Sequence, residues 1–147
     1  MLVRCAVFSV LLLLTLFGCK KEPTCSGQFA KYLLNGSQLQ SDTMYAIAGT
    51  QTIAFYQKGS SYDLAYGQIT LPSLQTGTYR IGSQAQISFV DTAKNGAVVF
   101  QGIDGFVNIY GSGNELAGLF AARCVNTSDS TQERVITGGQ FCGVPKR

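Results

Sequence analysis

Turn signals recur along this chain at intervals of about 8–12 residues, and this spacing constrains the fold more than any other feature. Asn35-Gly36, a strong hairpin dipeptide, ends the short apolar segment Phe29–Leu34. No stretch after Gly18 shows a sustained helical period with a cap at each end. We therefore predict an all-β fold, a single antiparallel meander of about ten short strands that closes into a sandwich or a small barrel.

The other predicted strands are segments of apolar, β-branched and aromatic residues between turn signals. They are Thr43–Ala48, Thr52–Gln57, Tyr62–Leu71, Thr78–Ile81, Ala85–Val90, Ala97–Gln101, Phe106–Tyr110, Glu115–Asn126 and Glu133–Cys142, with Asp104-Gly105 among the turns.

The last two segments form the best-defined hairpin, joined by a polar and flexible loop at Thr127–Gln132. Phe120 lies opposite Gly139 in the predicted register, where an aromatic ring covers a strand glycine. In the same register Cys124 lies opposite Val135, and both side chains face the core.

The N-terminus carries a secretory signal. A single positive charge, Arg4, precedes an apolar run from Ala6 to Phe17 that is shorter than a membrane-spanning helix. Leu16-Phe17-Gly18-Cys19 resembles the lipobox of bacterial lipoproteins, in which the cysteine is lipidated and becomes the mature N-terminus. We predict a signal peptide at 1–18, an acylated Cys19 with a tether at 19–27, and one domain at 28–147. A plain secretory signal or a buried N-terminal helix is the alternative.

The C-terminal part of the chain carries a family resemblance. Gly105–Ile109, Gly118-Leu119-Phe120 and Val135–Phe141, which closes on Thr137-Gly138-Gly139-Gln140-Phe141, resemble the C-terminal half of a large group of small Bacteroidota lipoproteins. The resemblance implies an all-β fold on a lipid anchor in the outer membrane, and it implies no activity. Surface-exported members often carry acidic residues after the cysteine. Lys20 and Lys21 depart from that pattern and favour the periplasmic face over the cell surface.

Composition excludes several functions. Charged residues make up 13% of the chain, and no Lys or Arg block exists that could neutralise nucleic-acid phosphates. The chain contains no histidine, which removes serine–histidine and cysteine–histidine catalysis and histidine-based zinc sites. Asp63, Asp91 and Asp104 are scattered, and Glu115 and Glu133 fall near opposite ends of the last hairpin. We predict no enzyme activity, no cofactor, no metal and no nucleic-acid partner.

Three cysteines remain after Cys5 is removed with the signal and Cys19 is acylated. The predicted register places Cys124 and Cys142 about 23 Å apart on opposite faces of the hairpin, too far for a disulfide. A Cys25–Cys142 bridge is therefore favoured, with Cys124 as a buried free thiol. The absence of any disulfide stays open as an alternative, and a zinc site is disfavoured.

Two functions are compatible with these features. The first is a membrane-anchored lipoprotein with a binding or structural role in the cell envelope, held to the bilayer through acylated Cys19. Tyrosines would supply its contacts to a protein or glycan partner, although tyrosines in strands are also commonly half-buried structural residues. The second is a lipocalin-like carrier with a small apolar ligand in a cavity lined by Phe89, Val107 and Phe120. The tyrosines of the candidate surface are Tyr45, Tyr56, Tyr62, Tyr66 and Tyr79.

Overall fold

The computed structural model describes residues 25–41, 43–59, 62–93 and 96–147, and every regular element in this part of the chain is a strand. The strands are β1 (Phe29–Leu34), β2 (Ser37–Ser41), β3 (Thr43–Ile47), β4 (Thr52–Gly59), β5 (Tyr62–Thr70), β6 (Gly77–Arg80), β7 (Gln86–Ala93), β8 (Gly96–Ser112), β9 (Glu115–Asn126) and β10 (Glu133–Pro145). Among these described residues there is no helix of the length and apolar character needed to cross a membrane.

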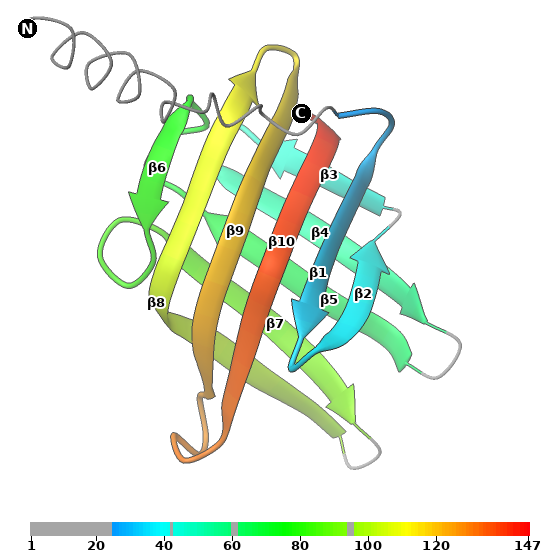
Figure 1. Ribbon diagram of the computed structural model, residues 1–147, viewed down its shortest axis with the longest axis vertical. Coiled ribbons are helices and arrows are strands. Elements are labelled where there is room, and N and C mark those ends of the chain that lie inside the picture. Colours follow the sequence, from blue (N-terminus) through cyan, green and yellow to red (C-terminus); the bar gives the residue numbers. More distant parts are fainter. Residues whose placement is uncertain (1–24, 42, 60–61, 94–95) are drawn as a thin grey trace, which may run out of the picture.

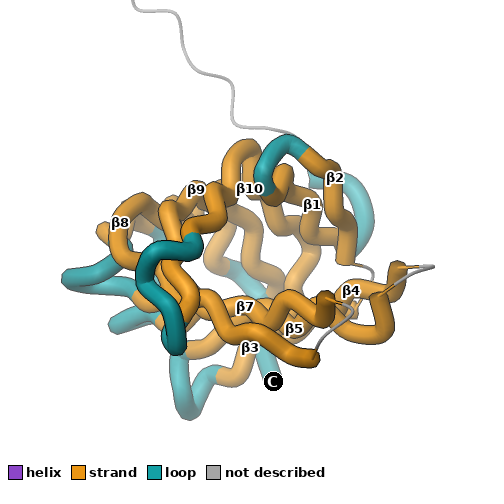
Figure 2. The backbone as a smooth tube through the Cα atoms, turned by 90° about the horizontal axis from the view of Figure 1, so that it is seen from below, coloured by secondary structure: helices purple, strands orange, loops and turns teal. Residues whose placement is uncertain are grey.

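The strands form one antiparallel sheet that curves into a nearly closed barrel (Figures 1 and 2). Their order is β2-β1-β10-β9-β8-β7-β5-β4-β3, and β6 pairs with β8 off this path. The residues after β10 reach β3: the backbone N–H of Arg147 donates to the Ala46 carbonyl at 2.8 Å, and the N–H of Ala48 donates to the Arg147 carbonyl at 3.0 Å. The predicted all-β meander is confirmed, and it is a barrel rather than an open sandwich.

Two differences from the predicted strands have clear local causes. β2 was not predicted because its sequence, Ser-Gln-Leu-Gln-Ser, lacks the apolar alternation of a half-buried strand. The predicted turn at Asp104-Gly105 is wrong, because β8 runs through it with a bulge between Gly102 and Asp104. The part of β8 before the bulge in the sequence pairs with β7, and the part after it pairs with β6. One long strand therefore pairs with two different strands on the same side.

The last hairpin has a register shift that the sequence did not reveal. Phe120 lies opposite Gly139 as predicted, but Cys124 lies opposite Arg134 rather than Val135. The cause is a bulge between Ile136 and Gly139, which adds one residue to β10. As a result Val135 points outward and is 43% exposed, so its predicted place in the core is wrong.

Large side chains fill the centre of the barrel. The Tyr32 ring lies 5.8 Å from the Phe55 ring and 5.9 Å from the Phe120 ring, measured between centroids. Since Tyr32 and Phe120 lie on β1 and β9 while Phe55 lies on β4 in the facing wall, these contacts cross the interior (Figure 1). Glycines make room for the rings: a side chain at Gly118 would collide with the Phe141 ring.

Candidate functional site

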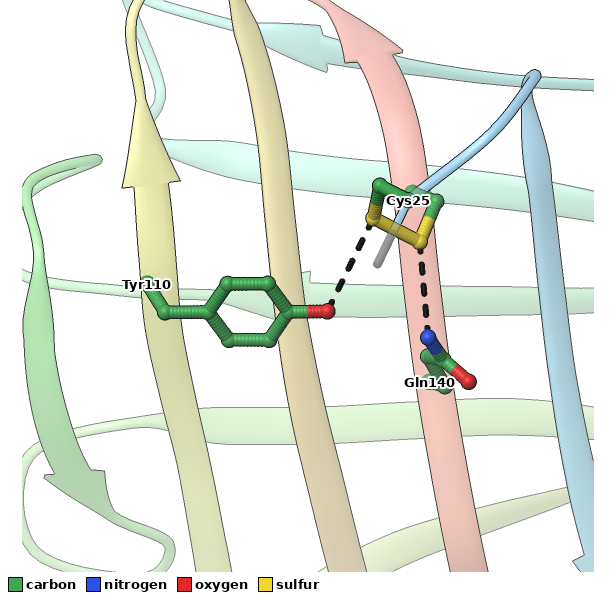
Figure 3. The surroundings of a disulfide bond; sticks show 4 residues. Cys25, Tyr110 and Gln140 are labelled. Atoms are coloured by element: carbon green, nitrogen blue, oxygen red, sulfur yellow. Dashed lines mark hydrogen bonds between the residues drawn. A yellow bond between two sulfur atoms is a disulfide. The ribbon is translucent and has the colours of Figure 1, made fainter. Parts of the chain in front are cut away.

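A disulfide fixes the N-terminal segment to the outer side of the last strand (Figure 3). Cys25 and Cys142 are bonded, with their Cα atoms 5.4 Å apart. The Tyr110 hydroxyl donates a weak hydrogen bond to Cys25 Sγ at 3.7 Å, and Gln140 Nε2 donates to Cys142 Sγ at 3.5 Å. Cys124 is free and belongs to the core cluster. The structure therefore contains the Cys25–Cys142 bond that the predicted register favoured.

The predicted lipidation site, Cys19, and the two lysines after it lie outside the described residues. Their positions in the sequence still limit the tether. Cys25 is the sixth residue after Cys19, and six extended residues span at most about 20 Å. Because Cys25 is bonded to β10, the end of the barrel that holds Cys142 is the end nearest to an anchor at Cys19.

The tyrosines of the candidate surface have structural roles wherever their side chains are described. The Tyr79 hydroxyl donates to the Gln75 carbonyl at 3.0 Å and also contacts the Ser73 hydroxyl at 2.9 Å. Tyr45 is half-buried on β3, with the Arg147 guanidinium 5.2 Å from its ring centroid. Tyr79 and Tyr45 thus lie on strands that are far apart in the sheet order. The side chains of Tyr56, Tyr62 and Tyr66 lie outside the described residues.

The residues expected to line a carrier cavity are core residues. Phe89, Val107 and Phe120 are each at most 2% exposed. The Phe89 ring stacks on the Phe100 ring at 5.1 Å between centroids, and Arg134 places its guanidinium 4.9 Å from the Phe100 ring. The space beside Phe89 is therefore occupied by the Phe100 ring.

An open groove of about 530 Å³ lies on the outer face of the barrel. Its floor comes from the bulged part of β8 and its neighbours, including Gln86, Gln101 and Ile103. These three side chains are exposed, which places the groove outside the core. One side of the groove is the turn between β6 and β7, at Gly82, and the other side is the loop between β9 and β10.

Hydrogen bonds order the loop that forms this second side. Asn126 is 7% exposed; its Nδ2 donates to Gln132 Oε1 at 3.1 Å, and its Oδ1 accepts from the Ser128 N–H at 2.8 Å. The Thr127 N–H donates to the Val99 carbonyl at 2.9 Å, which fixes the loop to β8. The predicted loop at Thr127–Gln132 is polar, and these hydrogen bonds connect its residues to one another and to β8.

Asp129 completes this hydrogen-bonded loop. The Thr131 hydroxyl donates to its carboxylate at 2.7 Å, and the Thr131 N–H donates at 3.1 Å. These bonds stabilise the charged carboxylate and hold the pKa of Asp129 below its usual range. The loop therefore keeps its hydrogen bonds at neutral pH.

The groove itself carries no charge. Its lining consists of amide, hydroxyl, aliphatic and glycine residues. Gln86 and Gln101 make no side-chain hydrogen bond to any other described residue, so both amides are free to meet a ligand. The sequence gives no functional signal at these two residues. Strand alternation accounts for their exposure, but only the fold brings them near the distant loop.

Two exposed ion pairs lie elsewhere on the described part of the barrel. Arg80 lies 3.8 Å from Asp104, and Arg123 lies 3.0 Å from Glu133. Glu133 and Glu115 sit at opposite ends of the last hairpin, as predicted. The side chains of Asp63 and Asp91 lie outside the described residues. Within the described part of the chain no three His, Cys, Asp or Glu side chains gather as a metal site would require.

Burial has one marked effect on titration. The Cys124 thiol is surrounded by the core and fully shielded from solvent. Because a thiolate there would lose its hydration, burial raises the pKa of Cys124 from 9.0 to about 12. This thiol is thus a structural group rather than a nucleophile.

Comparison with protein-family models, with curated proteins and with solved structures finds no match.

Proposed function

We propose that this chain is a lipid-anchored binding protein of the bacterial cell envelope whose ligand contacts the outside of the barrel. The observation that carries this proposal is the set of ring contacts across the interior. Phe55 reaches from one wall to within 6.1 Å of Phe120 on the other, measured between ring centroids. An apolar ligand inside would have to displace these rings, and the cost of opening a packed aromatic core is several kcal/mol.

The anchor in this proposal is an acyl group on Cys19. The support is the lipobox resemblance of Leu16-Phe17-Gly18-Cys19 together with the resemblance to small Bacteroidota lipoproteins. Two or more acyl chains hold a protein stably on a bilayer, since each buried methylene contributes about 0.8 kcal/mol. Lys20 and Lys21 favour retention on the periplasmic side of the outer membrane.

Metabolic labelling with a tagged fatty acid tests the anchor. The wild-type chain should take up the tag and fractionate with the outer membrane, and Cys19→Ala should do neither. Cys5→Ala is the matched control, because Cys5 lies in the signal segment and leaves with it. If Cys19→Ala retains the tag, the lipoprotein proposal fails. Protease accessibility in intact cells then places the domain on the periplasmic face or on the cell surface.

The alternative function, a carrier of a small apolar ligand, is tested separately. Native mass spectrometry of the chain extracted from membranes with mild detergent would detect a retained apolar molecule. A protein whose interior is filled should carry none. A stoichiometric apolar ligand that is lost in a Phe120→Trp variant would favour the carrier.

A further inference from the structure

We propose that the outer groove between Gly82 and the loop at 127–132 binds an extended, uncharged peptide segment of a partner protein. This inference rests on the proposed function and names the class of ligand for it. The lining residues that carry the argument are Gln86, Gln101, Ile103, Val125, Thr127 and Ser130.

The groove is formed before any ligand arrives. The Thr127 N–H and the Thr127 hydroxyl both donate to the Val99 carbonyl, at 2.9 and 3.3 Å, so the loop is held against the edge of the floor. The N–H of Asn126 donates to the Gln132 carbonyl at 3.0 Å and closes the base of the same loop. A site that is already ordered loses little conformational entropy when it binds, which is what a weakly attractive neutral ligand requires.

The chemistry of the lining matches a peptide backbone. A glutamine amide offers N–H donors and a carbonyl acceptor, which can pair with the carbonyl acceptor and the N–H donor of a peptide unit. Gln86 and Gln101 present such amides with no partner among the described residues. Ile103, which is 41% exposed, supplies an apolar contact on the same floor for the side chains of the segment.

The lining also disfavours other ligands. None of the lining residues is charged, so a charged segment would lose hydration without gaining a counter-charge. None is aromatic, so a sugar ring finds no face on which to stack. An uncharged polypeptide stretch needs neither a counter-charge nor an aromatic face, so it is compatible with this lining.

The position of the groove suits a partner that approaches from the side away from the membrane. Figure 1 shows the loop between β9 and β10 at one end of the barrel and the C-terminus at the other. From Cys142 to Glu133, β10 runs for about 30 Å at 3.3 Å per residue. That exceeds the reach of about 20 Å for the six residues after Cys19. The groove is therefore at the end that the tether leaves free.

The test is NMR titration of the ¹⁵N-labelled full chain in detergent micelles. The probe is a pool of acetylated, amidated pentapeptides randomised over Ser, Thr, Val, Leu and Asn. Because recognition acts on the peptide backbone, the pool as a whole should shift the side-chain amide signals of Gln86 and Gln101. A second pool that contains Lys and Glu, and the neutral oligosaccharide maltopentaose, are the comparison probes.

Gln101→Ala should weaken binding of the neutral pool about fivefold, the effect of losing one hydrogen bond. Gln40→Ala, an exposed glutamine on edge strand β2, should leave binding unchanged. The proposal is overturned if the neutral pool leaves both groove signals unmoved, if the charged pool binds as well, or if only maltopentaose shifts them, which would mark a glycan site. Because the titration does not involve the acyl group, a failure here leaves the anchoring test unaffected.

Discussion

The interior of this barrel and the groove on its outer face are lined by different kinds of side chain. The interior is closed by rings that pack across it, such as Tyr32 against Phe55 and Phe120, and glycines such as Gly118 give those rings room. The groove has no ring, and amides, hydroxyls and one exposed isoleucine line it. The difference teaches that side chains fill the inside of the barrel, whereas the outer surface beside the bulged strand has the open space in which we propose that a ligand binds.

The largest expected loss of stability comes from removing an aromatic ring from the interior. Phe120→Ala removes a ring that touches Tyr32, Phe55 and Phe141, and it should lower the free energy of unfolding by about 3–5 kcal/mol. Urea denaturation followed by circular dichroism measures this change. Phe106→Ala is the matched control, because Phe106 is 43% exposed on the outer face, and its loss should cost much less. Equal effects of the two variants would mean that the interior is not packed as described.

The next largest effect concerns the tethered end. Replacing both bonded cysteines, Cys25→Ser with Cys142→Ser, should lower the free energy of unfolding by about 2–4 kcal/mol, because the bond closes a loop of 117 residues in the unfolded chain. Thermal unfolding with and without a reducing agent measures the effect. The reducing agent should destabilise only the wild-type chain. If it destabilises the double variant equally, another bond is responsible.

The pH dependence of stability separates the core thiol from the surface. The folded-state pKa of Cys124 is raised from 9.0 to about 12, so the folded chain keeps this proton where the unfolded chain loses it. The stabilising contribution is complete below pH 9.0 and is lost as the pH rises through 12. Unfolding measured across this interval should therefore show a steeper decline for the wild type than for Cys124→Ala. Parallel curves would contradict the burial of this thiol.

The smallest effect belongs to the groove. Gln101→Ala should change the free energy of unfolding by less than about 0.5 kcal/mol, because the side chain is exposed and makes no hydrogen bond to the described residues. Chemical denaturation compared with Phe120→Ala gives the contrast directly. A loss of stability in Gln101→Ala comparable to that of Phe120→Ala would show that the groove is structural rather than a free surface.

The sequence predicted those features that depend on local pattern. Turn dipeptides and alternation predicted most of the strands, Phe120 opposite Gly139, and the choice of Cys25 over Cys124 as the partner of Cys142. It could not predict the bulges, because one added residue leaves no signature in a strand rich in glycine and apolar residues. The misplacement of Val135 follows from such a bulge.

The groove was beyond sequence reasoning for the same reason. It lies where β8 bulges between Gly102 and Asp104, and its lining combines Gly82 with residues of the loop at 127–132. Nothing in the sequence around Gln86 and Gln101 sets them apart from ordinary exposed glutamines. Only the three-dimensional arrangement distinguishes them.

A crystal structure determined under xenon pressure tests most directly whether ligands are confined to the outside of the barrel. Xenon occupies empty apolar cavities inside proteins. The contacts between Tyr32, Phe55 and Phe120 predict that no xenon atom binds in the interior that these rings occupy. A well-occupied xenon site between these three rings would contradict a filled interior and would restore the carrier as the better description of this protein.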